Sequence, residues 1–261
     1  MMLVAASEAG DAAHPFVTDD SGTQGAGNWQ VELLGQRDRH DHVADPGGGL
    51  TQQRLRVTLL NPVLTYGLLK NLDIAAGLNY ARYRISDDGF VTAEANGMSD
   101  STLELKWRFF EHNGFSLAVK PGIQLPTGDE DRGLGTGRTS WGVNFIATYD
   151  AKPWTLLGNI AYFRARFKLP ADEVANRGHL WRASGGAAFA ASEQVRLVGE
   201  LGVRTNIARS DPFLPGRTGQ FAMLGVIYSP TGKIDLDVGF RKGLNRAEID
   251  TAMLIGATFR W

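Results

Sequence analysis

The sequence predicts an all-β protein that forms a single closed antiparallel transmembrane β-barrel of about 12 strands. Three observations predict this fold class. Apolar residues alternate with polar or small residues over strand-length stretches, as side chains do on the two faces of a strand. Long and short connections between these stretches alternate along the chain. No segment approaches about 18 consecutive apolar residues, so a membrane-spanning helix is not expected.

Composition narrows the function classes. The 261 residues include 27 Lys and Arg and 28 Asp and Glu, for a net charge of −1, which gives no support for nucleic-acid binding. The sequence holds no cysteine, so neither a disulfide framework nor a thiolate metal site is available. Its 32 glycines suit tight turns and a crowded barrel interior.

The first residues suggest a processed N-terminus. Residues 1–13 begin with MMLVAA and are interpreted as the remnant of a signal peptide, although Glu8 and Asp11 interrupt them and no basic region precedes them. An ordinary flexible terminus is the alternative. Residues 14–28 are polar and Gly-rich, and we expect an irregular segment at the periplasmic end of a barrel formed by residues 29–261.

Alternation and turn residues place the strands in order. In the clearest case Leu103, Leu105 and Trp107 alternate with Glu104 and Lys106. The expected strands cover residues 29–36, 53–66, 72–84, 100–110, 115–125, 140–149, 154–166, 179–190, 195–204, 219–229, 234–241 and 251–261. Pro62 weakens the assignment of the second expected strand, because proline has no N–H to donate to a neighbouring strand. In 219–229 both faces are apolar, so its inward face stays undecided.

The connections fix the expected orientation. Long loops are expected at 37–50, 85–98, 126–139, 167–178, 206–218 and 243–250, and short turns at 69–71, 111–114, 150–153, 192–194 and 230–233. Bacterial outer-membrane barrels combine an even strand number, short periplasmic turns and longer outer loops. All six tryptophans lie in expected strands, as in the aromatic girdles of membrane interfaces. The core of a soluble β-sandwich is the alternative, disfavoured because the opposite faces carry many charges.

The Gly-rich loop at 126–138 allows two sharper interpretations. Its GLGTG run could suggest a phosphate loop, but a strand follows rather than a helix, and the Gly-Lys-Ser/Thr sequence is missing. Asp129, Glu130 and Asp131 could bind a divalent cation, but a solvated loop is the simpler interpretation.

Four stretches carry a family resemblance. These are HPFVTDDSGTQGAGNWQVEL at 14–33, NPVLTYGL at 61–68, MSDSTLELKW at 98–107 and KPGIQLPTGDEDRGLGTGRTS at 120–140. Together they resemble the family of meta-pathway phenol-degradation proteins, and the PTG…GLGTG pattern is the most specific part. The resemblance implies an outer-membrane β-barrel with a transporter-like role and suggests the location better than the substrate.

Inward-facing polar side chains are the candidate site. By alternation, the candidate lumen-lining residues are Arg54, Arg56, Asp73, Glu104, Lys106, Arg108, Lys120, Gln124, Asn144, Arg182, Arg196, Glu200, Arg204, Asp235, Asp237 and Arg241. They would line a channel that guides a solute. Alternatively, they pair with one another and fill a plugged lumen, because a barrel of about 12 strands lies between filled 8-stranded barrels and open porins.

Enzymatic interpretations are disfavoured. Of the five histidines, only His179 lies near the outer end of an expected strand, and no serine accompanies it on its face. The run His40-Asp41-His42 could be a metal pair, but a solvated Gly-rich loop is preferred, so no metal and no cofactor is assigned. Phe259 and Trp261 on the last strand resemble the C-terminal signal that barrel-assembly machinery recognises.

The sequence therefore predicts a channel or transporter in the outer membrane of a Gram-negative bacterium. It would pass a small, aromatic or hydrophobic molecule and would contact membrane lipid, lipopolysaccharide and the barrel-assembly machinery, but not nucleic acid. A structural or ligand-binding barrel with a plugged lumen is the alternative, followed by a lipid-modifying enzyme.

Overall fold

The computed structural model describes residues 15–45 and 47–261. The expected signal-peptide remnant at 1–13 lies outside the described residues. The strands are β1 (Trp29–Ala44), β2 (Thr51–Leu69), β3 (Leu72–Gly77), β4 (Tyr80–Asp87), β5 (Phe90–Met98), β6 (Ser101–His112), β7 (Phe115–Leu125), β8 (Ser140–Ala151), β9 (Trp154–Arg164), β10 (His179–Ala190), β11 (Val195–Thr205), β12 (Thr218–Thr231), β13 (Ile234–Gly243) and β14 (Thr251–Arg260). One short helix, α1 (Pro170–Ala175), lies between β9 and β10.

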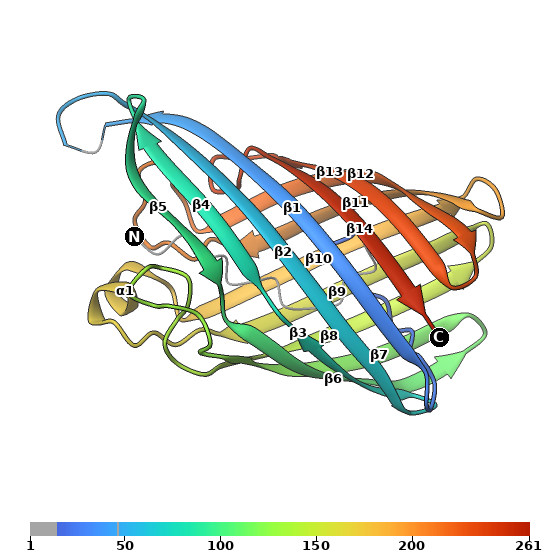
Figure 1. Ribbon diagram of the computed structural model, residues 1–261. Helices are drawn as coiled ribbons and strands as arrows, with labels where there is room; N and C mark the ends of the chain where they lie inside the picture. Colours follow the sequence, from blue (N-terminus) through green and yellow to red (C-terminus); the bar gives the residue numbers. More distant parts are fainter. Residues whose placement is uncertain (1–14, 46) are drawn as a thin grey trace.

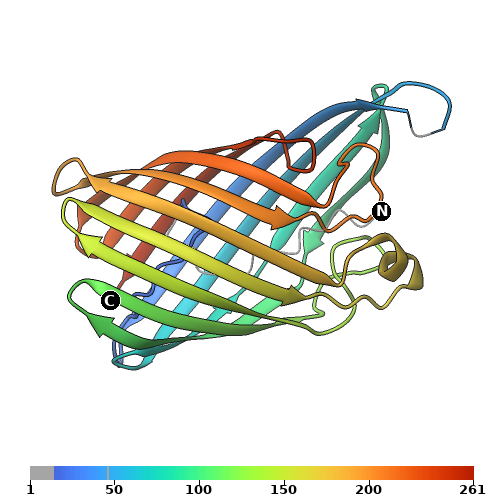
Figure 2. The same ribbon diagram turned by 180° about the vertical axis from the view of Figure 1, so that it is seen from behind.

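The strands close into an antiparallel barrel. From β6 to β14 each strand pairs with the next strand in sequence, β3 pairs with β6, and β2 pairs with both β3 and β4. Because β1 pairs with both β2 and β14, the sheet closes into 12 strands with two extra strands. Figures 1 and 2 show strongly tilted strands, with short turns at one end and longer loops and α1 at the other. The expected all-β barrel is confirmed. Closure removes the sheet edges of the barrel wall, and an edge remains at β5, which pairs only with β4.

The third expected strand, at residues 72–84, is divided into β3 and β4. β2 pairs with β3 up to Val63–Gly77 and with β4 from Leu60–Tyr80, so the break lies opposite Asn61 and Pro62. Pro62 lacks an N–H and cannot donate to the ladder. The proline therefore interrupts the neighbouring strand, while β2 itself runs unbroken for 19 residues.

Two of the expected outer loops contain β-strand residues. β1 continues to Ala44, so the expected loop at 37–50 is wrong over its first half. The expected loop at 85–98 is mostly β5, joined to β4 by Asp88 and Gly89 at positive φ (49° and 90°). Asp-Gly is a strong signal for a two-residue hairpin turn. The two strands form a hairpin that extends the barrel outward.

The outer surface carries an apolar band. On β9, Trp154, Leu156, Ile160 and Tyr162 face outward, and Ile160 is 58% exposed. From Trp154 to Tyr162 the strand covers about 26 Å at about 3.3 Å per residue. At a strand tilt of about 40° this corresponds to about 20 Å of membrane depth, near the band height of outer-membrane barrels.

Aromatic side chains border this band on both sides. At the turn end, Trp154 contacts Phe189 with ring centroids 4.8 Å apart. At the loop end, Tyr162 lies 5.6 Å from Trp141 and 4.7 Å from Trp181. Aromatic girdles of this kind mark the two interfaces of a bilayer. Among the described residues, none of the helical segments has the length and apolar character needed to cross a bilayer.

Candidate functional site in the barrel lumen

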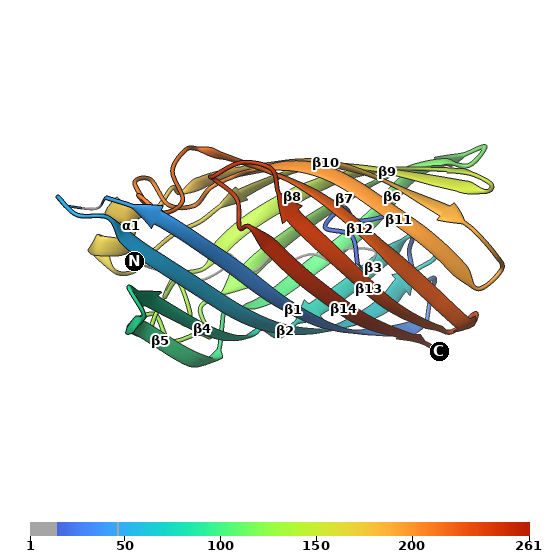
Figure 3. The same cartoon turned by 90° about the horizontal axis from the view of Figure 1, so that it is seen from above.

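Residues 15–24, which precede β1 and form the N-terminal segment, lie inside the barrel (Figure 3). At its start Pro15 packs on two glycines, and a Cβ on Gly225 or Gly239 would lie within 2.8 Å of its ring. Phe16 is 2% exposed and packs with Met223 and other side chains of an apolar lumenal cluster. Because these two glycines have no side chain, Pro15 can pack directly against the barrel wall.

Polar wall residues hold the next part of the segment. Glu200 accepts hydrogen bonds from the Val17 amide (2.8 Å) and the Thr18 hydroxyl (2.5 Å). The Asn159 side chain both accepts from the Asp19 amide (2.7 Å) and donates to the Asp19 carbonyl (2.9 Å). The backbone groups of the segment are thus satisfied by side chains, as buried irregular backbone requires.

Asp19 is the charged centre of the lumen. Its carboxylate pairs with Lys106 Nζ at 2.9 Å and with Lys120 Nζ, and Lys120 also lies 3.8 Å from Glu104. The side chains of Asp19 and Lys120 are 3% and 2% exposed. Buried charges are stable only when paired in this way.

Further along, the segment stays on the inner wall. The Ser21 amide donates to Thr148 Oγ1 (2.9 Å), and its hydroxyl lies 2.6 Å from that of Ser116. The Gln24 amide donates to Asp73 Oδ2 (2.9 Å). From Pro15 to Gln24 the segment therefore contacts β12 and β13 first and β3 last, and it occupies part of the lumen.

A cavity of about 340 Å³ lies between this segment and the outer loops. Phe16 and Val17 border it on the segment side, and Leu214, Glu248 and Ile249 belong to the loops. The wall between them mixes apolar side chains with charges: Leu55, Val57, Phe163, Lys120, Arg182 and Arg241. Such a mixture suits a solute with an apolar body and a polar group.

Arginines from two strands line the outer part of this cavity. Arg204 and Arg241 lie 5.9 and 5.6 Å from the centre of the buried Phe221 ring. Arg204 binds Glu248 of the β13–β14 loop through Nε (2.8 Å) and a terminal nitrogen (2.5 Å). Burial acts to raise the pKa of Glu248, but Arg204, together with Arg241 and the Ile249 amide, holds this pKa below the ordinary value. This ion pair fixes the loop over the lumen.

The Gly-rich loop is organised by a buried carboxylate. Asp100, 0% exposed, accepts hydrogen bonds from the Gly128 amide (3.1 Å), the Gln124 amide group (2.9 Å) and both the amide and the hydroxyl of Thr136 (2.8 and 2.7 Å). A Cβ on Gly135 would lie 2.6 Å from Asp100 Oδ1. The PTG…GLGTG pattern is therefore a loop built around Asp100.

The neighbouring acidic run is engaged in local contacts. Asp129 accepts from the Arg132 amide at 3.1 Å, and Glu130 pairs with Lys168 of the next loop. The Lys168 hydrogen bond lowers the pKa of Glu130. This supports the solvated-loop interpretation over a cation site.

Most candidate lumen residues lie on the inward faces of their strands. The burial pattern places Asp73, Glu104, Lys106, Arg108, Lys120, Gln124, Asn144, Arg182, Arg196, Glu200, Arg204, Asp235, Asp237 and Arg241 there. Several of them hold the N-terminal segment rather than face a free passage, as Glu200, Lys120 and Asp73 do.

The assignment of Arg54 and Arg56 to the lumen is wrong. Leu55 and Val57, 1% and 6% exposed, point inward and pack with Ile85, so the two arginines lie outside. Arg56 pairs with Asp41 of β1 at 2.6 Å. Alternation defines two faces but not which one is inward, and here the outer part of β2 is polar outside and apolar inside.

The sequence did not single out Asp19, Asp100 or Glu248. Their contacts join segments far apart in the chain, so no local spacing reveals them. A signal was present for Asp100 in the resemblance motif MSDSTLELKW, which contains it. His179 lies at the start of β10, where Nδ1 is 2.7 Å from the Tyr162 hydroxyl.

Comparisons with known proteins agree with this architecture. The family model described as "Putative MetA-pathway of phenol degradation" matches residues 12–261, so the chain belongs to this family. No curated protein matches the chain.

Solved structures share the fold. The COG4313 outer membrane channel from Pseudomonas putida F1 is similar with a TM-score of 0.64 and 17% identity, over 93% of this chain and 98% of that chain. The translocator domain of the autotransporter NalP from Neisseria meningitidis gives a TM-score of 0.56 and 15% identity, over 92% and 91%. The NanC porin gives 0.53 and 8%, over 88% and 98%.

The fold, the family and the lipid-facing band define the class of protein. It is a β-barrel of the outer membrane of Gram-negative bacteria, as the sequence predicted. Its structural neighbours include an outer-membrane channel and a porin.

Proposed function

We propose that this protein is a channel for passive passage of a small molecule with an aromatic or hydrophobic body. The observation that carries the proposal is the cavity of about 340 Å³ with a mixed lining of apolar and charged side chains. Leu55 and Phe163 supply apolar contact, and Arg182 and Arg241 supply positive charge beside it. An aromatic carboxylate matches this pairing, because its ring and its anion meet complementary groups.

In this proposal the N-terminal segment sets the narrowest point. Residues 15–24 occupy the inner wall through side-chain contacts, so a solute passes beside the segment or after it shifts. Passive passage requires binding that is favourable enough for entry and weak enough for release. A shallow cavity above a narrow point fits that requirement.

Two measurements test the proposal. In planar bilayers the purified protein should give single-channel currents above background, and in liposome-swelling assays it should admit benzoate. Benzoate is the appropriate probe because an uncharged phenol crosses the lipid by itself. Absence of both conductance and benzoate uptake would reject the channel and favour the plugged, structural or ligand-binding barrel, which the many contacts of residues 15–24 support.

An enzymatic role stays the weaker alternative. An outer-membrane lipid-modifying enzyme would need a reactive group at the outer rim, where His179 contacts Tyr162. We expect that the unmodified protein hydrolyses neither phospholipid nor lipid A, and that His179→Ala does not differ from it. Hydrolysis that His179→Ala abolished would overturn the non-enzyme proposal.

The end of the chain supports a proposal on assembly. Phe259 faces outward on β14, and Trp261 follows with 57% exposure. We infer that barrel-assembly machinery recognises these two aromatics, and that the mature barrel contacts lipid and lipopolysaccharide. Phe259→Ala with Trp261→Ala should lower outer-membrane levels, whereas Met253→Ala on the same face of β14 should not. Equal levels in all variants would reject the signal.

A further inference from the structure

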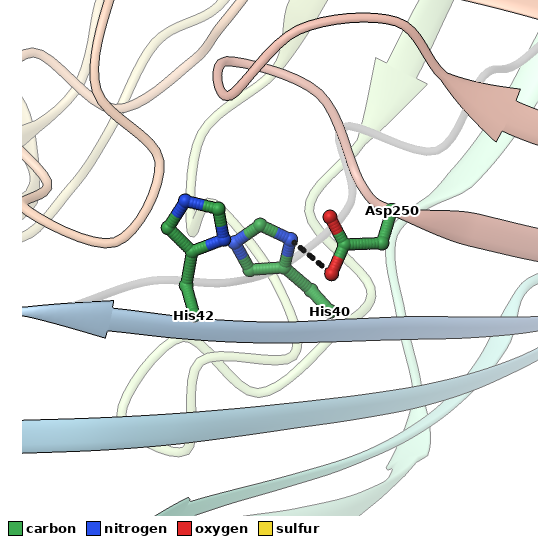
Figure 4. Close-up of side chains that lie close together, drawn as sticks. All are labelled: His40, His42 and Asp250. Carbon is green, nitrogen blue, oxygen red and sulfur yellow. Dashed lines mark ion pairs between the residues drawn. The ribbon is translucent and has the colours of Figure 1, made fainter.

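Two histidines and an aspartate meet at the outer end of β1 (Figure 4). His40 and His42 lie two residues apart on β1, so both imidazoles leave the same face of the strand. Asp250 precedes β14, which pairs with β1. One nitrogen of each ring and one carboxylate oxygen all lie within 4.8 Å of one another.

The hydrogen bond on the far side of His40 fixes its tautomer. His40 Nε2 lies 2.9 Å from the Phe213 carbonyl oxygen. A carbonyl oxygen carries no proton, so Nε2 is the donor, and in the neutral ring Nδ1 holds a lone pair. Histidines that bind metals commonly donate their other N–H to a backbone carbonyl, which orients the ring.

The Nδ1 atom faces a second electron-rich atom. It makes no hydrogen bond and lies 3.4 Å from Asp250 Oδ2, while His40 is 1% exposed. Asp250 Oδ2 also accepts the Asp41 amide at 2.8 Å, which holds the carboxylate in place. His40 is buried and the Asp250 side chain is 33% exposed, and a cation between the two facing lone pairs would stabilise this arrangement.

We propose that His40, His42 and Asp250 bind one divalent transition-metal ion, for which Zn²⁺ is the natural probe. Two imidazole nitrogens and one carboxylate oxygen match the borderline preference of zinc and leave a fourth position for water or solute. Ligand atoms around a tetrahedral Zn²⁺ lie about 3.3 Å apart. His42 is only partly buried, and its ring stacks on that of His40 with ring centroids 4.9 Å apart. Rotation of the His42 side chain out of this stack brings its ligand nitrogen to the ion.

The bound ion would join three parts of the outer barrel. His40 and His42 belong to β1, Asp250 ends the β13–β14 loop, and Phe213 belongs to the β11–β12 loop. These loops border the lumenal cavity, so the ion would hold its outer rim together. The alternative cation is a proton on His40, which would pair with Asp250 and leave no affinity for metal.

Zinc titration of the full chain, purified without a histidine tag, tests the proposal. Calorimetry should give one Zn²⁺ per chain, with affinity at least about tenfold weaker in His42→Gln and in Asp250→Asn. His179→Gln, which removes an exposed histidine from another strand, is the control and should bind as the unmodified protein does. His40 is left unchanged because its burial makes folding defects expected.

Two further readouts sharpen the test. Zn²⁺ should slow tryptic cleavage at Arg246 and Arg217 in the two loops several-fold, and not in Asp250→Asn. Cu²⁺ bound in place of Zn²⁺ should show hyperfine coupling to two imidazole nitrogens, and to one in His42→Gln. Equal zinc affinity in the folded variants and the unmodified protein would overturn the proposal. It would also be overturned if Asp250→Asn weakened zinc binding and His42→Gln did not.

Discussion

Asp19 of the N-terminal segment and Lys120 of β7 form an ion pair inside the barrel, with both side chains almost fully buried. Lys106 and Glu104 complete the cluster from the neighbouring strand. The pair joins a segment without secondary structure to the wall of the barrel.

Loss of the Asp19 charge should release the segment. Breaking a buried ion pair by removing one partner costs about 3–5 kcal/mol, which suffices to populate a displaced segment. Asp19→Asn should therefore raise single-channel conductance in planar bilayers. Asp20→Asn is the matched control, because the Asp20 carboxylate accepts a hydrogen bond from the Gly22 amide of the same segment. Equal conductance in both variants would show that the segment does not limit flow.

The corrected orientation of β2 predicts where charge affects ion selectivity. Arg182 lines the cavity, whereas Arg56 lies outside and pairs with Asp41. A fixed charge acts strongly on ions only across a short path of low dielectric constant. Reversal potentials in a KCl gradient should shift toward cations in Arg182→Gln and stay unchanged in Arg56→Gln. A larger shift in Arg56→Gln would contradict the placement of β2.

Asp100 should be the main determinant of the Gly-rich loop. Asp100→Ala leaves the Gly128, Gln124 and Thr136 donors without their acceptor, at about 1.5–3 kcal/mol per hydrogen bond to a charged group. Since such losses are not additive, we expect about 3 kcal/mol or more less stability in urea unfolding and faster proteolysis within 126–139. Asp129→Ala, in the same loop but exposed, should change the unfolding free energy by less than about 0.5 kcal/mol.

The lipid-facing band predicts a position-dependent cost for charge. Ile160→Lys places a cation on the exposed face of β9 near the middle of the band and should cost about 2–4 kcal/mol. Refolding yield in lipid vesicles and heat-modifiable gel migration measure this effect. Val174→Lys in α1, at a residue 76% exposed in an outer loop, should refold normally. Equal refolding of the two variants would show that Ile160 does not face lipid.

Acid should loosen the β13–β14 loop through Glu248. Its folded-state pKa lies below the ordinary value of 4.5, so its contribution to stability is complete above that value and is lost as pH falls through the lowered pKa. Hydrogen exchange of residues 244–250 should therefore accelerate below pH 4.5. In Glu248→Gln the exchange should be fast at all pH values, without this transition. A transition that persists in Glu248→Gln would assign it to another group.

Much of the wall was predictable because strand periodicity is local. Alternation around Leu103 and Trp107 identified β6, and turn residues located the short connections. The hairpin of β4 and β5 was missed, although Asp88-Gly89 signalled it, because the stretch 85–98 was interpreted as a long outer loop. The inward face of β12 stayed undecided, and burial of Phe221 and Met223 now defines it.

The sequence by itself determined the fold class, the membrane, the family and most inward positions, since all of these follow from residues close together in the chain. Only the tertiary structure decided which face of β2 points inward, how residues 15–24 fill the lumen, and that His40 meets Asp250. The physical reason is closure: pairing of β1 with β14 joins the two ends of the chain, and one interior then receives side chains from every strand.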